Sequence, residues 1–414
     1  MRTTRVGGRI GGWLAGLACV AVVVGVSSPA PARPDGTLPA RAVEASAWPA
    51  RWASAERGSP GAIRPLDLSG KSLRSGRLPW QLGDGPNEAA TAALLIPAAH
   101  EGPAPEFEFE GPGSVIFFEQ PLEPKEKPDG ATEHFVFVSA RPGAAGADGA
   151  AGRPRVERTW FAYYAPKGEA KGLLLLIPGT FGEPKALTDR IVRQLQGRGF
   201  GVVRMVSQPS RFTEKMTFTI DKADPDSALG AIAGELGQRA AECAYAAEGA
   251  MAHVRAAHPE VAALPRFAVG ASGGAMVMPT VLAREPGAYK AAVLIAGGAD
   301  FFTTIDTSNY KSMIDAVSFR WVPEPPTDEE RAALAARYLA RAPLDSANTA
   351  LAVRGTRFLL VHATVDMAVP AAQGDLLWER LGKPERWSEV AGHELIFVKV
   401  ASRLGEMMDW LARP

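Results

Sequence analysis

Short, largely apolar runs recur along the chain between residues 172 and 390. Each is four to six residues long, and the run 172–177 is continuously apolar, as is typical of a strand buried on both faces of a sheet. They occupy residues 172–177, 201–206, 266–269, 291–295, 357–362 and 386–390. Longer segments with helical character separate them, and strands that alternate with helices predict a doubly wound, mostly parallel α/β sheet.

The longest of these helical segments covers residues 227–258. Its apolar residues recur at steps of three and four, which places them on one face of a helix packed against the sheet. They are Leu229, Ile232, Leu236, Ala240, Cys243, Ala247, Ala250 and Val254. We therefore expect Cys243 to be a core residue.

The first 32 residues have the pattern of a signal peptide. Three arginines without an acidic residue precede an apolar stretch over 10–26, and Ala-Pro-Ala follows at 30–32. A basic start, an apolar centre and a small-residue cleavage site are the parts of an export signal. The pattern predicts an exported protein; an uncleaved membrane anchor is the alternative. Without the leader Cys243 is the one cysteine, so no internal disulfide is expected.

Composition divides the rest of the chain. Residues 33–100 are rich in Pro, Ala and Gly, which predicts a flexible linker. Residues 101–155 contain short alternating runs and then a Gly/Ala-rich stretch, which predicts a small β-rich extension and a loop. The main α/β domain then covers 156–414.

The charge balance bears on one class of partner, nucleic acids, and none is expected. Removing the three leader arginines from the 45 basic residues leaves 42 against 45 acidic ones. Such a balance does not favour a nucleic-acid partner. The sequence implies no metal and no cofactor, and it leaves the oligomeric state open.

The most informative motif is Gly-Ala-Ser-Gly-Gly at residues 270–274. It follows the strand-like run 266–269 and precedes an apolar helical stretch, 275–282. A serine at the apex of a tight strand-to-helix turn, flanked by glycines, is the arrangement of a nucleophile elbow. Ser272 is therefore the candidate nucleophile; the alternative is a small turn residue without a chemical role.

An acid and a histidine follow in the order that such a serine requires. Asp366 lies in the turn after the run 357–362, and His393 follows the run 386–390. Chain order Ser, Asp, His with each residue after a strand is the order of this catalytic arrangement.

Two other residues compete for these roles. Asp375 is a second carboxylate, but it falls within a predicted helix over 371–381 and is expected on the surface. His362, at the end of a strand near the acid, is either a support for the site or a core residue. The remaining histidines, His100, His134, His253 and His258, are expected to be structural or exposed.

From about residue 159 to 414 the chain resembles the α/β-hydrolase-fold serine hydrolases, closest to their esterase and serine-peptidase branches. Asp-x-x-Val-Pro at 366–370 and Gly-His at 392–393 are motifs that recur in that family. Two positions depart from it: Pro-Gly at 178–179, where many members have His-Gly, and His-Ala at 362–363.

The resemblance implies a mechanism. His393 takes the proton of the Ser272 hydroxyl, and Asp366 holds the imidazole in the required tautomer. An acyl-enzyme forms on Ser272. The backbone N–H groups of Gly273 and of Thr180 or Phe181 are expected to bind the oxyanion.

In this fold an insertion such as residues 300–353 caps the site. Four of its aromatic residues are expected to line the substrate pocket, and the alternative is that they pack the insertion onto the core. They are Phe301, Phe302, Phe319 and Trp321.

The sequence therefore predicts an exported hydrolase that cleaves a carboxylic ester. A serine peptidase of the same fold and a non-catalytic binding module of the cell envelope are the alternatives. The expected partner is a small ester or a peptide, and no stable membrane span is expected once the leader is removed.

Overall fold

The computed structural model describes residues 62–65, 130–143, 152–180, 185–207, 215–311 and 316–413. All of these lie in one compact unit, residues 41–414. The predicted leader, nearly all of the predicted linker, the first part of the predicted extension (101–129) and nearly all of the Gly/Ala-rich loop lie outside the described residues. Within the described part, no helix has the length and apolar character needed to cross a membrane.

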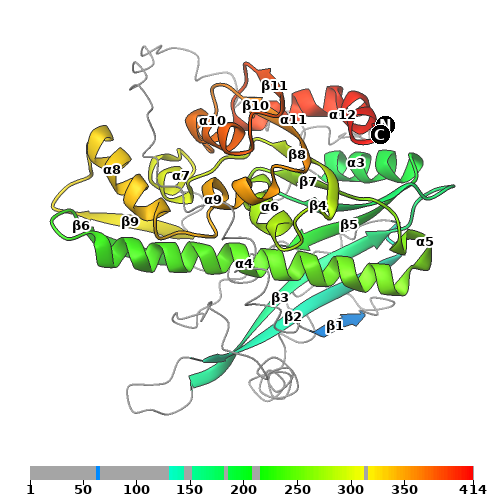
Figure 1. Ribbon diagram of the computed structural model, residues 1–414, viewed down its shortest axis with the longest axis horizontal. Helices are drawn as coiled ribbons and strands as arrows, with labels where there is room; N and C mark the ends of the chain where they lie inside the picture. Colours follow the sequence, from blue (N-terminus) through cyan, green and yellow to red (C-terminus); the bar gives the residue numbers. More distant parts are fainter. Residues whose placement is uncertain are drawn as a thin grey trace, which may run out of the picture. The chain divides into compact units, whose positions relative to one another are not determined.

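A nine-stranded sheet forms the centre of this unit (Figure 1). Its order is β1 (Ala62–Pro65), β2 (Glu133–Gly143), β3 (Gly152–Tyr164), β5 (Phe200–Ser207), β4 (Gly172–Ile177), β7 (Arg266–Ala271), β8 (Tyr289–Ile295), β10 (Arg357–Ala363) and β11 (Glu385–Glu389). Pairing is parallel from β5 to β11 and antiparallel from β1 to β5. The predicted doubly wound, mostly parallel sheet is confirmed.

Both faces of the sheet are covered, and β4 shows why its sequence is continuously apolar. Leu173 and Leu175 belong to the core on one face, whereas Leu174 and Leu176 belong to the core on the other. Successive side chains of a strand point to opposite faces, so a strand inside such a sheet needs apolar residues at every position.

Different helices cover the two faces. The first face packs on α4 (Asp226–Ala257), α6 (Gly273–Ala283) and α10 (Ala371–Arg380). The second packs on α3 (Lys185–Gly197), α11 (His393–Ser402) and α12 (Leu404–Leu411). The short α5 (Pro259–Ala262) follows α4. Cys243 is fully buried in α4, as its place in the apolar stripe predicts.

The predicted extension adds strands to this sheet. β2 and β3 form a long antiparallel pair, and β3 pairs with β5. β1 lies within the predicted linker, yet its backbone pairs with β2, so these four residues are a strand in the structure. Backbone pairing to an open sheet edge depends little on side-chain pattern, which explains why composition did not indicate β1.

A second, two-stranded sheet lies in the region of the predicted insertion. Here β6 (Met216–Asp221) pairs in parallel with β9 (Val317–Val322). The insertion also contains α7 (Phe301–Thr307), α8 (Asp328–Leu339), α9 (Ser346–Thr349) and the 3-10 turn η4 (Ala350–Val353). We call 300–353 together with β6 the cap. β6 precedes α4, so two distant segments build the cap.

Candidate active site

Ser272 lies in the turn between β7 and α6 with φ 49° and ψ −120°. This conformation is sparsely populated for residues with a side chain and is typical of functional turns. The backbone N–H of Ser272 donates to the carbonyl of Ile295 at 2.8 Å, which fixes the turn against β8.

The glycines on either side of Ser272 are required by close backbone contacts. A Cβ at Gly270 would lie 2.8 Å from the carbonyl oxygen of Gly274, and a Cβ at Gly274 would lie 2.4 Å from that of Ile177. Neither neighbour is a flexible side chain that could move away. The Gly-x-Ser-x-Gly pattern therefore reflects the packing of strand, turn and helix at this point.

The structure brings together the three residues that the sequence placed in order. His393 Nε2 lies 2.8 Å from Ser272 Oγ, and His393 Nδ1 lies 2.7 Å from Asp366 Oδ2. The other carboxylate oxygen of Asp366 accepts from the N–H groups of Ala368 and Val369. These bonds hold the carboxylate in place, so it can orient the imidazole toward the serine.

Asp375 lies elsewhere. Its side chain is 46% exposed and accepts a hydrogen bond from Arg386 at 2.6 Å. His362 is buried, with Nε2 3.9 Å from Asp375. Burial and the charge of Arg386 lower the pKa of His362, which favours a neutral imidazole there. A Cβ at Gly374 would lie 2.6 Å from its ring, so His362 packs tightly on α10.

Two of the predicted oxyanion donors lie next to each other. Gly273 is the first residue of α6, where a backbone N–H has no acceptor within the helix. A Cβ at Gly273 would lie 2.5 Å from Thr180 Oγ1 and 3.4 Å from the backbone nitrogen of Thr180. The third predicted residue, Phe181, lies outside the described residues.

A cavity of about 140 Å³ opens beside Ser272 and His393. Its wall is mainly apolar and comes from α4, α6, α7 and β9. Its apolar residues include Leu236, Ala240, Met276, Val277, Ile305 and Val317. This volume is close to that of cavities that hold a benzene-sized guest, about 150 Å³.

Of the four aromatic residues predicted to line the pocket, only Phe301 is among the described residues that do so. Phe302 instead stacks on Phe319 with ring centroids 4.9 Å apart, and both lie edge-on to Trp321. The structure thus shows these three side chains packed against one another inside the cap, away from the cavity wall.

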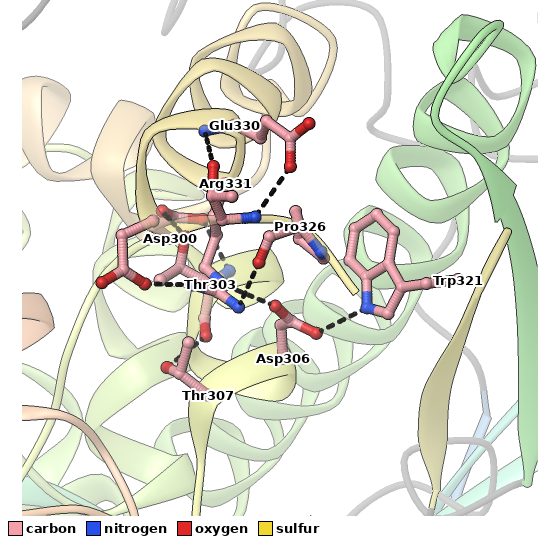
Figure 2. A network of polar contacts seen from close by, with 10 residues as sticks. Asp300, Thr303, Asp306, Thr307, Trp321, Pro326, Glu330 and Arg331 are labelled. Atoms are coloured by element: carbon pink, nitrogen blue, oxygen red, sulfur yellow. Dashed lines mark hydrogen bonds and ion pairs between the residues drawn. The ribbon is translucent and has the colours of Figure 1, made fainter. Parts of the chain in front are cut away.

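Polar contacts hold this part of the cap together, as Figure 2 shows. Asp306 on α7 accepts from Trp321 Nε1 at 3.0 Å and from Arg331 Nε on α8 at 2.7 Å. Arg331 also donates to the carbonyl of Pro326. Trp321, and through it the ring cluster with Phe302 and Phe319, is therefore tied to a hydrogen-bonded unit that joins α7, β9 and α8.

Sequence reasoning missed two charged residues of the cavity wall, Arg239 and Lys311. Arg239 lies within the predicted helix 227–258, whose apolar stripe predicts only packing against the sheet. It follows Leu236 by three residues and precedes Ala240, and this spacing alone places it at the edge of that stripe.

Ser272 is hydrogen-bonded to His393, and His393 is hydrogen-bonded to Asp366, at the edge of a doubly wound sheet. This arrangement defines a class of enzyme: the protein is an α/β-hydrolase-fold serine hydrolase. Residues 251–393 match the model of the Prolyl oligopeptidase family, Peptidase_S9. This segment contains Ser272, Asp366 and His393. No curated protein matches the chain by sequence.

Solved structures with a related arrangement include an acylaminoacyl peptidase from Pyrococcus horikoshii, which is 13% identical over 67% of this chain and 41% of its own, with a TM-score of 0.42. Est1E from Butyrivibrio proteoclasticus is 13% identical over 66% of this chain and 98% of its own, with a TM-score of 0.40. A highly thermostable carboxyl esterase from Bacillus coagulans is 11% identical over 67% and 99%, with a TM-score of 0.38. The match thus spans less than half of the length of the acylaminoacyl peptidase.

Proposed function

We propose that this serine hydrolase is exported and cleaves a carboxylic ester through an acyl-enzyme on Ser272. The observation that carries the proposal is the hydrogen-bonded chain from Ser272 through His393 to Asp366 at the mouth of an apolar cavity. An activated serine beside an apolar pocket suits attack on the carbonyl of an acyl group that the pocket holds.

In the first half of the reaction, Ser272 Oγ attacks the ester carbonyl carbon and His393 Nε2 takes the hydroxyl proton. Asp366 accepts the hydrogen bond from Nδ1–H and stabilises the imidazolium. The oxyanion of the tetrahedral intermediate is held by the backbone N–H groups of Gly273 and Thr180. The bond to the alcohol oxygen then breaks, and the alcohol leaves with the proton from His393.

Water completes the reaction. It attacks the acyl carbon while His393 takes one of its protons, and a second tetrahedral intermediate uses the same two N–H donors. Collapse of this intermediate releases the carboxylic acid. The proton returns from His393 to the Ser272 oxygen, which restores the enzyme.

A serine peptidase is the second candidate, and the match to the Prolyl oligopeptidase family favours it. A peptidase that acts near a free amino terminus needs a carboxylate to hold the ammonium group. Among the described residues that line the cavity there is no Asp or Glu. This charge pattern supports ester cleavage over cleavage next to a free amino terminus.

One set of assays tests the proposal. A fluorophosphonate probe should label the wild-type protein on Ser272, and alkyl esters should be hydrolysed faster than aminoacyl amides of equal size. Faster cleavage of the amides would establish the peptidase. Failure to label, together with no turnover of either series, would support a non-catalytic binding module of the cell envelope.

Export is proposed from the leader pattern in residues 1–32. The test is expression of the full chain in a bacterial host and amino-terminal sequencing of the protein from the envelope fraction. A mature protein that begins at residue 33 is expected. A full-length protein retained with the cells would contradict cleavage and favour the anchor.

A further inference from the structure

A charged pair is buried beside the cavity. Arg239 on α4 lines the cavity, and its Nε donates to Glu235 Oε1, one turn earlier, at 2.7 Å. The side chains of Arg239 and Glu235 are only 5% and 4% exposed. Leu236 and Ala240, on the same face of α4, also line the cavity, so this face turns Arg239 toward the substrate space.

Stability alone explains this pair poorly. Taking two charges out of water carries a large desolvation cost for each ion, and apolar residues of similar volume commonly stabilise a core as well or better. The neighbours of Arg239 on the wall are such residues, among them Met276, Val277 and Val317. A buried cation among these apolar residues therefore indicates a role in binding.

Among the described residues of the cavity wall, the charged side chains have one sign. Arg239 and Lys311 both line the cavity, and no carboxylate does so in the described part of the chain. Glu235 pairs with Arg239 without being part of the wall. Wall charges of one sign in a small apolar space attract a ligand of the opposite sign and discriminate against one of the same sign.

We propose that Arg239 determines specificity by binding a carboxylate on the acyl group of the substrate, separated from the scissile carbonyl by a short apolar chain. The planar guanidinium suits a carboxylate, since it donates several N–H groups in a fixed fork. The apolar chain packs on the wall, and Lys311 adds a second positive charge. Glu235 holds the guanidinium in position before the substrate arrives. This inference rests on the proposed ester hydrolysis at Ser272.

The first experiment compares two substrates of the same shape. These are monoethyl adipate, whose acyl chain ends in a carboxylate, and the same ester with a terminal amide. A series of monoesters of dicarboxylic acids with four to eight carbons then varies the distance between the scissile carbonyl and the carboxylate. The wild-type enzyme should prefer the carboxylate by at least about tenfold in kcat/KM, as expected for a hydrogen bond to a charged group. In Arg239→Met this ratio should fall to about one.

Arg337→Met is the matched control. Arg337 is a cap arginine that pairs with Asp226 and does not belong to the cavity wall in the described residues. It removes the same charge from the same protein and should leave the ratio unchanged. An equal fall of the ratio in both variants, or wild-type turnover that favours the amide, would overturn the inference.

Glu235→Gln gives a second test, in which the preference for the carboxylate should change in the opposite direction to that in Arg239→Met. It keeps the shape of the side chain but removes the charge that competes for Arg239, so the preference for the carboxylate should rise. Adipate should also raise the Tm of this variant more than that of the wild type, because its carboxylate no longer competes with the charge of Glu235 for the guanidinium. A lower Tm with no gain in preference would mean that the pair only holds structure.

Calorimetric binding of adipate separates this inference from the proposed function. If no ester is turned over but adipate binds the wild type and not Arg239→Met, the anion site stands and ester hydrolysis fails. If esters with a terminal amide are cleaved and adipate binds both proteins equally, ester hydrolysis stands and the role of Arg239 is refuted.

Discussion

Backbone strain and hydrogen bonding meet on the same residue at Ser272. Its positive φ places the side chain outside the regular path of β7 and α6, and the bond from its N–H to Ile295 holds that conformation. Strain of this kind costs about 1–3 kcal/mol and persists only where the surroundings impose it. The surrounding fold therefore holds Ser272 in the strained conformation that presents its hydroxyl.

Two replacements of Ser272 separate the chemical role of its hydroxyl from the strain of its backbone. Ser272→Ala should abolish fluorophosphonate labelling and reduce turnover by about a million-fold, because the nucleophile is gone. Ser272→Gly should be equally inactive but more stable than the alanine variant by about 1 kcal/mol, since glycine adopts a positive φ without strain. Turnover and urea unfolding measure the two effects. Activity of the alanine variant within tenfold of the wild type would refute the assignment.

The choice between the two carboxylates is tested by paired substitutions. Asp366→Asn should reduce kcat by about ten-thousand-fold, since the amide permits the wrong tautomer of His393. Asp375→Asn should have little effect, because this residue faces solvent and pairs with Arg386. The reverse pattern of rates would show that the structure places the wrong acid at the site.

At the scale of elements, a pair of buried acids positions the cavity wall. Asp300 caps α7 by accepting from Thr303 N, and Asp345 accepts from the N–H groups of Asp300 and Phe301 at 2.9 and 2.7 Å. Tyr338 donates its hydroxyl to Asp345 as well. Burial and the charge of Asp345 raise the pKa of Asp300 to about 7.

This pKa predicts a pH dependence of stability. Between about pH 4 and 7 the folded protein keeps the proton of Asp300 while the unfolded chain has lost it, so the free energy of unfolding falls as the pH rises. Asp300→Asn lacks this dependence and keeps an oxygen for Thr303. Relative to the wild type, the variant should therefore gain a few kcal/mol between pH 5 and pH 8. Urea unfolding at both values measures the change; an equal difference at both would contradict it.

At the scale of the whole molecule, contacts between ionisable groups join the antiparallel part of the sheet, at β2, to helix α4 of the parallel core. Glu133 at the start of β2 contacts His253 Nε2 at 2.7 Å and His258 Nε2 at 3.1 Å, both near the end of α4. Burial raises the pKa of Glu133, but the hydrogen bonds from the two histidines outweigh it and lower the pKa below its usual 4.5.

Glu133→Gln should therefore destabilise the protein near neutral pH by about 1 kcal/mol, a modest value because the site is partly exposed. Because the pKa of Glu133 is lower in the folded than in the unfolded protein, its carboxylate stabilises the fold at pH values above the unfolded-state pKa. This contribution is lost as the pH falls through the folded-state pKa. The difference from the wild type should shrink below about pH 4.5, and thermal unfolding at several pH values measures it. Glu260→Gln, which removes a longer contact to His258, should have a smaller effect. A difference independent of pH would contradict this account.

Much of the fold and of the site could be predicted from the sequence because the signals are local. A buried parallel strand needs a continuous apolar run, and a serine elbow needs glycines at fixed positions around Ser272. The carboxyl ends of parallel strands meet at one edge of a sheet, so residues after successive strands converge there. Chain order alone therefore indicated that Asp366 and His393 would lie near Ser272.

Tertiary structure decided what depends on contacts between distant segments. The spacing of aromatic residues could not show that Phe302, Phe319 and Trp321 pack on one another, since their contacts join α7 to β9. β6 alternates apolar and polar residues, but nothing local to it indicates its pairing with β9, about a hundred residues later. Arg239 follows the apolar stripe of α4, but only the packing of α4 against α6 and the cap makes it part of the cavity wall. Sequence determines which residues a helix or strand presents together, whereas the folded chain determines what those residues face.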